Sequence, residues 1–267
     1  MTTRPLESSE EKELLPPGST RAALGAWGGW SPDGKWIYYT QANDKPGFND
    51  LWRLNVATLK KELLIKNAGG VSTSPPTPSP DGASIAFFRG KSLMLAGAEG
   101  RNERVLYEEH DPSTRGLVWS ADSSQLLFPI GFYDANETKL GLLTVATKQV
   151  KSLAPFKGSV FSMVWPSWSS GPFLVGRVWD RTAGYPLKSS AIWYLSLPQD
   201  QRTEITHEPA RYAAILGAGA DGFSLVAQRM VPPPSGWDHF VEVLNSFGMS
   251  LPVQGNFHPS VILMLKK

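Results

Sequence analysis

Three aspartates, Asp134, Asp180 and Asp238, are the candidates for carboxylate chemistry, because each lies in a segment rich in aromatic and turn-forming residues. A glycosidase or lyase would need two such carboxylates about 5–10 Å apart in one pocket, as acid and as base or nucleophile. The sequence therefore leaves open an enzyme with carboxylates or histidine at one site, provided that the fold brings these segments together.

Two histidines lie beside carboxylates, in His110-Asp111-Pro112 and His207-Glu208-Pro209. Such a pair could transfer protons or form half of a metal site. The alternative is a polar loop that recurs for structural reasons, and we adopt it because most loop residues only connect elements. We therefore assign no catalytic residue to either pair.

The sequence lacks the common catalytic and cofactor motifs. It has no G-x-S-x-G nucleophile elbow, no H-E-x-x-H zinc motif and no G-x-x-x-x-G-K-[ST] phosphate loop. The absence of cysteine excludes disulfides, thiolate metal sites and a cysteine nucleophile. A net charge of +2, from 26 Lys and Arg against 24 Asp and Glu, argues against a nucleic-acid binder. The sequence thus predicts no metal and no cofactor.

Aromatic and charged residues concentrate in the intervals 130–138, 178–190 and 230–239. Such residues on surface loops are typical of binding hot spots, although loops of a degenerate repeat also vary without function. The candidate binding residues in these intervals are Tyr133, Asp134, Trp179, Asp180, Arg181, Tyr185, Trp237, Asp238 and His239.

The elements that must position these residues follow from an internal repeat. Ser31-Pro32-Asp33-Gly34 recurs at 79–82, and degenerate copies begin at 120, 169 and 219, a mean spacing of 47 residues. Proline presets the first central φ of a turn and glycine accepts the positive φ that closes a hairpin. The aspartates of this turn motif are therefore predicted to be structural rather than catalytic.

Three apolar or alternating segments follow each of the first four copies, and the segment before each copy makes four strands per unit. After the first copy they are 36–40, 50–56 and 60–65, and after the second 84–88, 92–96 and 103–108. With 25 Gly and 22 Pro against long helices, this pattern predicts an all-β propeller of four-stranded blades.

Tryptophan forms a second candidate set. Trp30, Trp119 and Trp168 each stand directly before a turn motif, which predicts a repeated packing position. Trp27 and Trp165 precede two of them by three residues, so on a strand they would point to the opposite face. There they could stack on a ligand at the channel mouth or simply fill space.

The run WSPDGKWIYYT, followed by DLWRLN and KKELL, resembles the PD40 (WD40-like) repeat of TolB-like β-propellers. The same repeat occurs in the propellers of prolyl-oligopeptidase-like peptidases. The resemblance implies a propeller fold and, because the nucleophile elbow is absent, includes a peptidase-type propeller that lacks its hydrolase domain. These motifs specify fold more than function.

The predicted organisation is a flexible N-terminal tail, 1–9, and a single propeller, 10–267. Its repeats are 25–68, 70–112, 113–157, 158–208 and 209–245. Lys12-Glu13-Leu14-Leu15 recurs at 61–64, so the N-terminal segment is predicted to close the ring as an outer strand of the last blade. The tail 246–267 belongs either to a degenerate sixth blade or to an appendage on five.

The predicted function is a non-catalytic binding or scaffold propeller that recognises a protein, peptide or small ligand on one face or at the channel mouth. The alternatives are the carboxylate enzyme and the peptidase-type propeller. We expect a soluble chain, because no apolar stretch reaches the ~20 residues of a membrane helix. With no export signal in the sequence, the chain would be periplasmic if a signal was removed and otherwise cytoplasmic.

Overall fold

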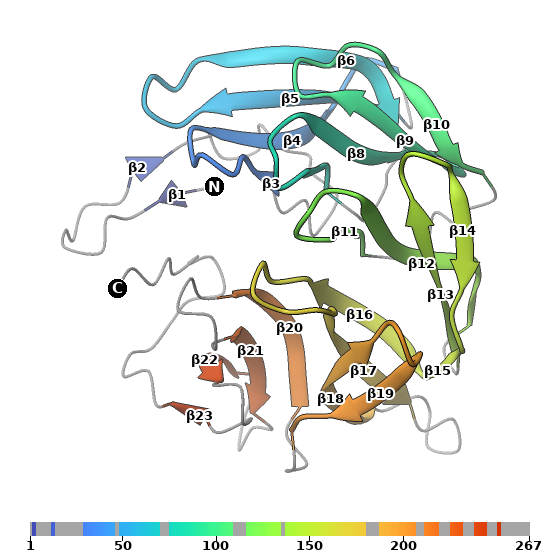
Figure 1. The fold of residues 1–267 in the computed structure, drawn as a ribbon. Helices are drawn as coiled ribbons and strands as arrows, with labels where there is room; N and C mark the ends of the chain where they lie inside the picture. The colour runs from blue at the N-terminus through green and yellow to red at the C-terminus, as the bar shows by residue number, and fades with distance from the viewer. Residues whose placement is uncertain are drawn as a thin grey trace. The chain divides into compact units, whose positions relative to one another are not determined.

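The computed structural model describes residues 2–3, 12–13, 29–45, 48–69, 75–108, 116–134, 137–179, 187–206, 211–218, 225–231, 238–244 and 250–251, and all of its regular elements in these ranges are strands (Figure 1). The chain divides into two compact units. The first contains Lys12–Tyr133 and Gly141–Ser152, and the second contains Thr2–Glu11, Asp134–Leu140 and Leu153–Lys267. No helix in the described ranges is long and apolar enough to span a bilayer.

Five antiparallel sheets account for most of the strands, and we number them blades 1 to 5 in chain order. Blade 1 contains β3 (Gly29–Trp30), β4 (Trp36–Ala42), β5 (Asn49–Asn55) and β6 (Lys61–Gly69). Blade 2 contains β7 (Thr77–Pro78), β8 (Ser84–Arg89), β9 (Ser92–Gly97) and β10 (Arg104–Tyr107). Blade 3 contains β11 (Val118–Trp119), β12 (Gln125–Asp134), β13 (Glu137–Thr144) and β14 (Gln149–Ser152), and β15 (Phe156–Lys157) also pairs with β13.

The last two blades belong to the second unit. Blade 4 contains β16 (Ser159–Val164), β17 (Phe173–Trp179), β18 (Leu187–Ser196) and β19 (Gln201–Glu204). Blade 5 contains β20 (Arg211–Ala218), β21 (Leu225–Val231), β22 (Asp238–Leu244) and β23 (Ser250–Leu251). The predicted all-β architecture of four-stranded blades is confirmed.

In the described residues, the fourth strand of blade 5 is β23, from the tail 246–267, and not the N-terminal segment. The short strands β1 (Thr2–Thr3) and β2 (Lys12–Glu13) belong to none of the five blades. The rest of the predicted tail 1–9, and residues 14–28 and 252–267, lie outside the described residues. Closure of the ring and the choice between five and six blades therefore stay predictions.

Three of the described hydrophobic clusters each lie between two successive blades. Tyr38 and Leu51 of blade 1 pack with Phe87 and Met94 of blade 2. A second cluster joins blades 2 and 3, and a third joins blades 4 and 5. Strand residues alternate between the two faces of a sheet, so blade 2 supplies Phe87 to the cluster with blade 1 and Phe88 to the cluster with blade 3.

The three tryptophans that precede a turn motif pack against hydrophobic clusters, as predicted. Trp119 is buried in the cluster between blades 2 and 3, and its indole N–H donates to the Thr77 carbonyl at 2.9 Å. Trp168 packs against the cluster between blades 4 and 5, with its ring 5.7 Å from that of Phe173. Trp30 packs on the blade 1 cluster of Ile37, Tyr39 and Leu54.

The turn motif between the first two strands of a blade is held by its serine. In blade 1, the Gly34 N–H donates to the Ser31 carbonyl at 2.9 Å, with Gly34 at φ +69°. The Ser31 hydroxyl donates to Asp33 at 2.6 Å and accepts from the Trp36 N–H at 2.9 Å. Blades 2 and 3 repeat these contacts, with Ser123 at φ +62° where the other copies have glycine.

Replacing Ser79 by alanine is expected to lower the free energy of unfolding by about 1 to 2 kcal/mol. The hydroxyl of buried Ser79 donates to Asp81 and accepts from the Ser84 N–H at 2.9 Å, so its loss leaves the N–H of half-buried Ser84 without this acceptor. Urea unfolding measures the change. Ser169→Ala is the matched control. In this degenerate copy of the turn no aspartate accepts from the serine hydroxyl, which donates instead to the Gly171 carbonyl. Equal losses in both variants would contradict the prediction.

Candidate functional site

The three intervals expected on surface loops, 130–138, 178–190 and 230–239, are strand wherever the structure describes them. Strand β12 continues to Asp134 and β13 begins at Glu137, so only two residues separate them. Likewise β17 runs to Trp179 and β18 begins at Leu187. The extensions are physically reasonable, because aromatic and β-branched residues favour a pleated strand. The candidates with a described backbone thus lie on the ends of the strands, next to the connections between the second and third strands.

Five candidates have a described backbone but no described side chain. Tyr133 and Asp134 end β12, and Trp179 ends β17. Asp238 and His239 begin β22, where they pair with Val231 and Met230 of β21. Five other candidates lie outside the described residues: Trp27, Asp180, Arg181, Tyr185 and Trp237. Both histidine–carboxylate pairs, His110-Asp111 and His207-Glu208, also lie outside them.

Within the second unit, the hairpins of blades 4 and 5 end on the same side. The Ser162 hydroxyl of β16 donates to the Ile215 carbonyl of β20 at 3.0 Å and accepts from the Ile215 N–H at 3.2 Å. The starts of the two second strands, at Phe173 and Leu225, share one core cluster. The ends of β17 and β21 therefore correspond, which places the backbones of Trp179 and Asp238 at the same end of neighbouring blades.

Trp165 does not lie on a strand, contrary to the sequence prediction. Strand β16 ends at Val164, and Trp165 and Trp168 both belong to the segment that follows it. Pro166 explains the difference, because proline cannot donate to a strand ladder. The indole N–H of the half-buried Trp165 donates to the Ser169 carbonyl at 3.2 Å, so this ring is bonded to its own turn.

The motif aspartates are ionised and engaged within their turns. The Ser31 hydroxyl holds the pKa of Asp33 below its usual value, and the backbone N–H of Lys35 adds to the effect. The pKa values of Asp81 and Asp122 are lowered in the same way, by Ser79 and Ser120. A catalytic acid needs a raised pKa, so these carboxylates fit the structural role predicted for them.

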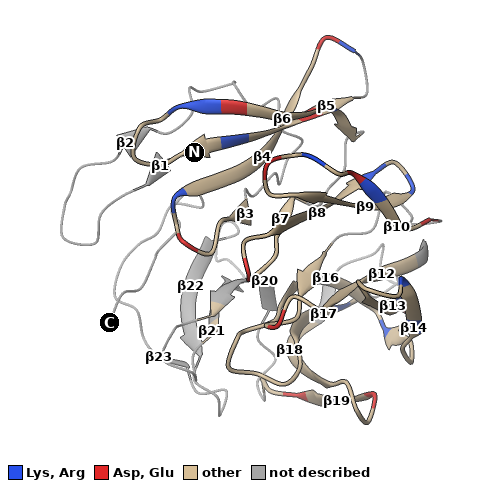
Figure 2. Cartoon of the chain, turned by 45° about the horizontal axis from the view of Figure 1, so that its top comes forward, with Lys and Arg blue, Asp and Glu red and all other residues tan. Residues whose placement is uncertain are grey.

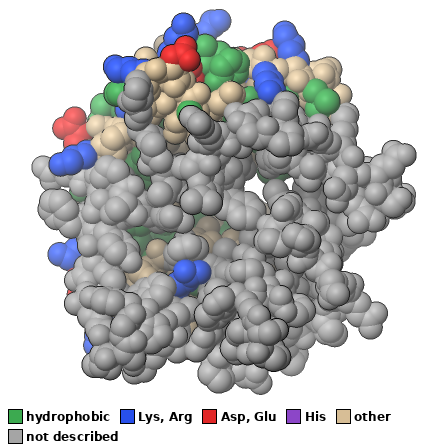
Figure 3. All heavy atoms as spheres, turned by 180° about the vertical axis from the view of Figure 1, so that it is seen from behind, with side chains coloured by type: hydrophobic (Ala, Val, Ile, Leu, Met, Phe, Trp, Pro, Cys, Tyr) green, Lys and Arg blue, Asp and Glu red, His purple; other side chains and the backbone are tan. Residues whose placement is uncertain are grey.

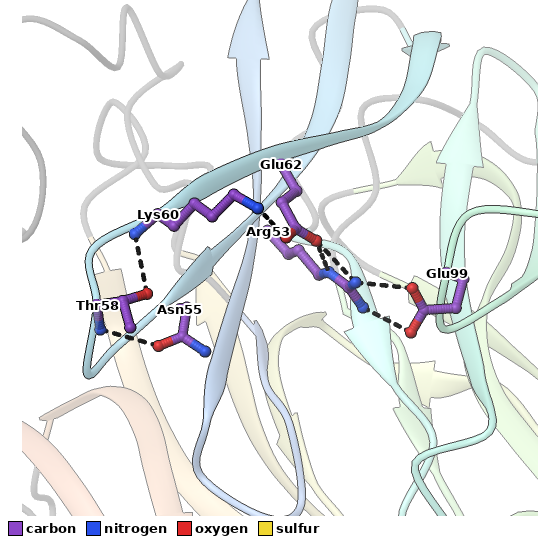
Figure 4. A network of polar contacts seen from close by, with 6 residues as sticks. All are labelled: Arg53, Asn55, Thr58, Lys60, Glu62 and Glu99. Carbon is purple, nitrogen blue, oxygen red and sulfur yellow. Dashed lines mark hydrogen bonds and ion pairs between the residues drawn. The ribbon is translucent and has the colours of Figure 1, made fainter.

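A network of polar contacts around Arg53 was not predicted from the sequence (Figure 4). Arg53 of β5 donates to Glu62 at 2.9 Å through Nε, and to the two carboxylate oxygens of Glu99 at 2.8 and 2.7 Å. Its guanidinium lies 4.1 Å from the centre of the Trp36 ring. Lys60 lies 3.5 Å from Glu62. The signal in the sequence is an arginine in the apolar segment DLWRLN, opposite a glutamate of the next strand.

Charges of both signs adjoin one another on the described surface. Figure 2 shows Lys and Arg next to Asp and Glu along β6 and near the β9–β10 turn. The face drawn in Figure 3 has the same mixture among its coloured side chains. Among the described side chains, no three His, Asp or Glu residues gather as a metal site would require. The described part of the surface therefore offers mixed polar contacts rather than a basic stripe.

No family model matches the sequence, and no curated protein does either. Among solved structures, TolB from Acinetobacter baumannii matches 92% of this chain and 56% of its own, with 14% identity and a TM-score of 0.64. Putative TolB from Agrobacterium tumefaciens matches 91% and 83%, with 16% identity and a TM-score of 0.64. The β-propeller domain of the Trilobed protease from Pyrococcus furiosus matches 82% and 68%, with 19% identity and a TM-score of 0.57.

The fold is that of a β-propeller. The chain spans about half the length of the Acinetobacter TolB structure that it matches. Other matches to this propeller are a nidogen–laminin complex and an oligogalacturonate lyase in complex with manganese, each at 13% identity. Likeness at these identities concerns the fold alone and does not distinguish binding from catalysis.

Proposed function

We propose that this β-propeller is a non-catalytic binding module that recognises a protein or peptide with the hairpin ends of blades 4 and 5. The observation that carries the proposal is the placement of Trp179, Asp238 and His239 where the second strand of a blade meets the third. Aromatic and charged residues on a rigid strand scaffold are typical of binding sites.

The other charged side chains considered above are engaged in structural contacts, which supports a non-catalytic assignment. The carboxylates of Asp33, Asp81 and Asp122 are bonded within their turns, and Arg53 is bonded to two glutamates. None of these groups is arranged as an acid–base pair. Catalysis by Asp134, Asp180 and Asp238 stays a prediction, because their carboxylates lie outside the described side chains.

Simultaneous alanine substitution of Trp179, Arg181, Trp237 and His239 is expected to abolish binding of the partner, measured by quantitative pull-down from an extract of the source organism. The matched control replaces Lys35 and Lys60 by alanine. These lysines lie in the turns after the first and third strands of blade 1, at the opposite end of a blade from its second hairpin. A fourfold variant that retains every partner of the wild type would overturn the proposal.

A further inference from the structure

The β9–β10 turn of blade 2 lies directly on blade 1. Gly100, at φ +74°, belongs to this turn, and a Cβ atom there would lie 2.7 Å from the Leu64 carbonyl oxygen of β6. No side chain larger than hydrogen fits between these backbones, since real Cβ contacts are not found at that distance. Leu64 also packs against the core cluster between the two blades. The turn is therefore a cover over the outer part of that core.

A single arginine side chain fastens this cover. Arg53 has 11% of its side chain exposed and reaches from β5 of blade 1 to both carboxylate oxygens of Glu99 in the turn. Nη1 also lies 3.5 Å from the Ala98 carbonyl. On its other side the same guanidinium binds Glu62 of β6, at 2.7 Å from Nη2. The two carboxylates, one from each blade, therefore share one cation.

The contacts of Arg53 with Glu62 and Glu99 depend on both carboxylates being ionised. Hydrogen bonding by Arg53 lowers the pKa of Glu62 and of Glu99. Lys60 also lowers the pKa of Glu62, and Arg101 lowers that of Glu99, whereas Glu62 raises the pKa of Glu99. Tyr38, from β4, interacts with Arg53 and Glu99, and Asp33 acts on Tyr38.

We propose that Arg53 and Glu99 form an acid-sensitive latch between blades 1 and 2, which releases the β9–β10 turn from β6 when the carboxylates are protonated. A carboxylate with a lowered folded-state pKa contributes stability above its unfolded pKa. That contribution begins to fall below pH 4.5, the ordinary value for glutamate, and disappears as the pH falls through the folded-state pKa of Glu99, which Arg53 holds below 4.5. Opening uncovers Leu64 and loosens the edge of the core.

The absence of cysteine allows a direct test with two spin labels. Lys61→Cys on β6 and Arg101→Cys on the turn are both at exposed positions, and the loss of the Arg101 charge beside Glu99 is common to all the variants compared. Double electron–electron resonance should give a narrow distance distribution at pH 7 and a broader, longer one at pH 3.5. The variant Glu99→Gln, which carries a neutral amide in place of the carboxylate, should give the broad distribution already at pH 7.

Lys60→Gln is the matched control, because Lys60 contacts Glu62 but its ion pair does not reach blade 2. It should keep the narrow distribution at pH 7. A narrow distribution for Glu99→Gln at pH 7 would overturn the latch, even if the wild type unfolds in acid. The same conclusion follows if the labels on the folded wild type stay equally close at pH 7 and pH 3.5.

Discussion

Replacing Phe128 by alanine is expected to lower the free energy of unfolding by about 3 to 5 kcal/mol, enough to unfold a marginal domain. Phe128 of β12 has no exposed surface. Its ring lies 5.2 Å from that of Tyr107 and 6.4 Å from that of Phe88, in the cluster between blades 2 and 3. The truncation removes the apolar burial and these ring contacts and leaves a cavity between two sheets that cannot easily collapse.

Equilibrium unfolding in urea, followed by circular dichroism, measures this loss. Leu63→Ala is the control, because Leu63 lies on β6 with 37% of its surface exposed and should lose less than 1 kcal/mol. Similar losses for the two variants would show that the space between the blades is not closely packed, contrary to the buried cluster around Phe128.

The strands of the fold could be predicted from the sequence because turn chemistry is local. Ser79-Pro80-Asp81-Gly82 specifies its hairpin with contacts inside six residues, so the apolar segment 84–88 had to follow as strand β8. The same reasoning located β9, predicted at 92–96 and observed at Ser92–Gly97. The packing of the repeated tryptophan could also be predicted, because a bulky residue at the same position of several repeats implies the same kind of apolar neighbour in each. Trp119, buried between blades 2 and 3, is an example.

The particular polar contacts between blades could not be predicted from the sequence. Arg53 and Glu99 are 46 residues apart, and their meeting depends on how far blade 2 is shifted along blade 1. Nothing in a single strand encodes that shift. The extension of β12 to Asp134 was missed for a related reason: glycine and proline in PIGFYD indicate a loop, but pairing across the hairpin keeps it a strand.

The candidate site was only partly predictable for the same physical reason. Residue types identify aromatic and charged positions such as Trp179 and His239, and the repeat assigns them to the second hairpin of a blade. Which of them meet depends on the register of neighbouring blades, which the sequence does not contain. Trp165 illustrates the error that follows, since a spacing argument assumed a strand that Pro166 ends.

Replacing Gly176 by alanine is expected to destabilise the second unit by about 3 kcal/mol, as overpacking of a closed core does. Gly176 lies on β17 of blade 4, and its missing Cβ would lie 2.0 Å from Cζ of Phe156. That ring cannot move easily: Phe156 is 4% exposed, packs edge-on against Trp193 at 5.6 Å, and pairs through its backbone with Thr138.

The cause can be isolated by a double-mutant cycle, because the penalty comes from one contact. Phe156→Leu shortens the opposing side chain, so the double variant Gly176→Ala with Phe156→Leu should be more stable than Gly176→Ala alone. Gly97→Ala is the control, since a Cβ there meets no atom closer than 3.4 Å, and its unfolding midpoint should hardly change. If Phe156→Leu gives no rescue, the ring is not what excludes a side chain at position 176, and the glycine must instead be required by the backbone of β17.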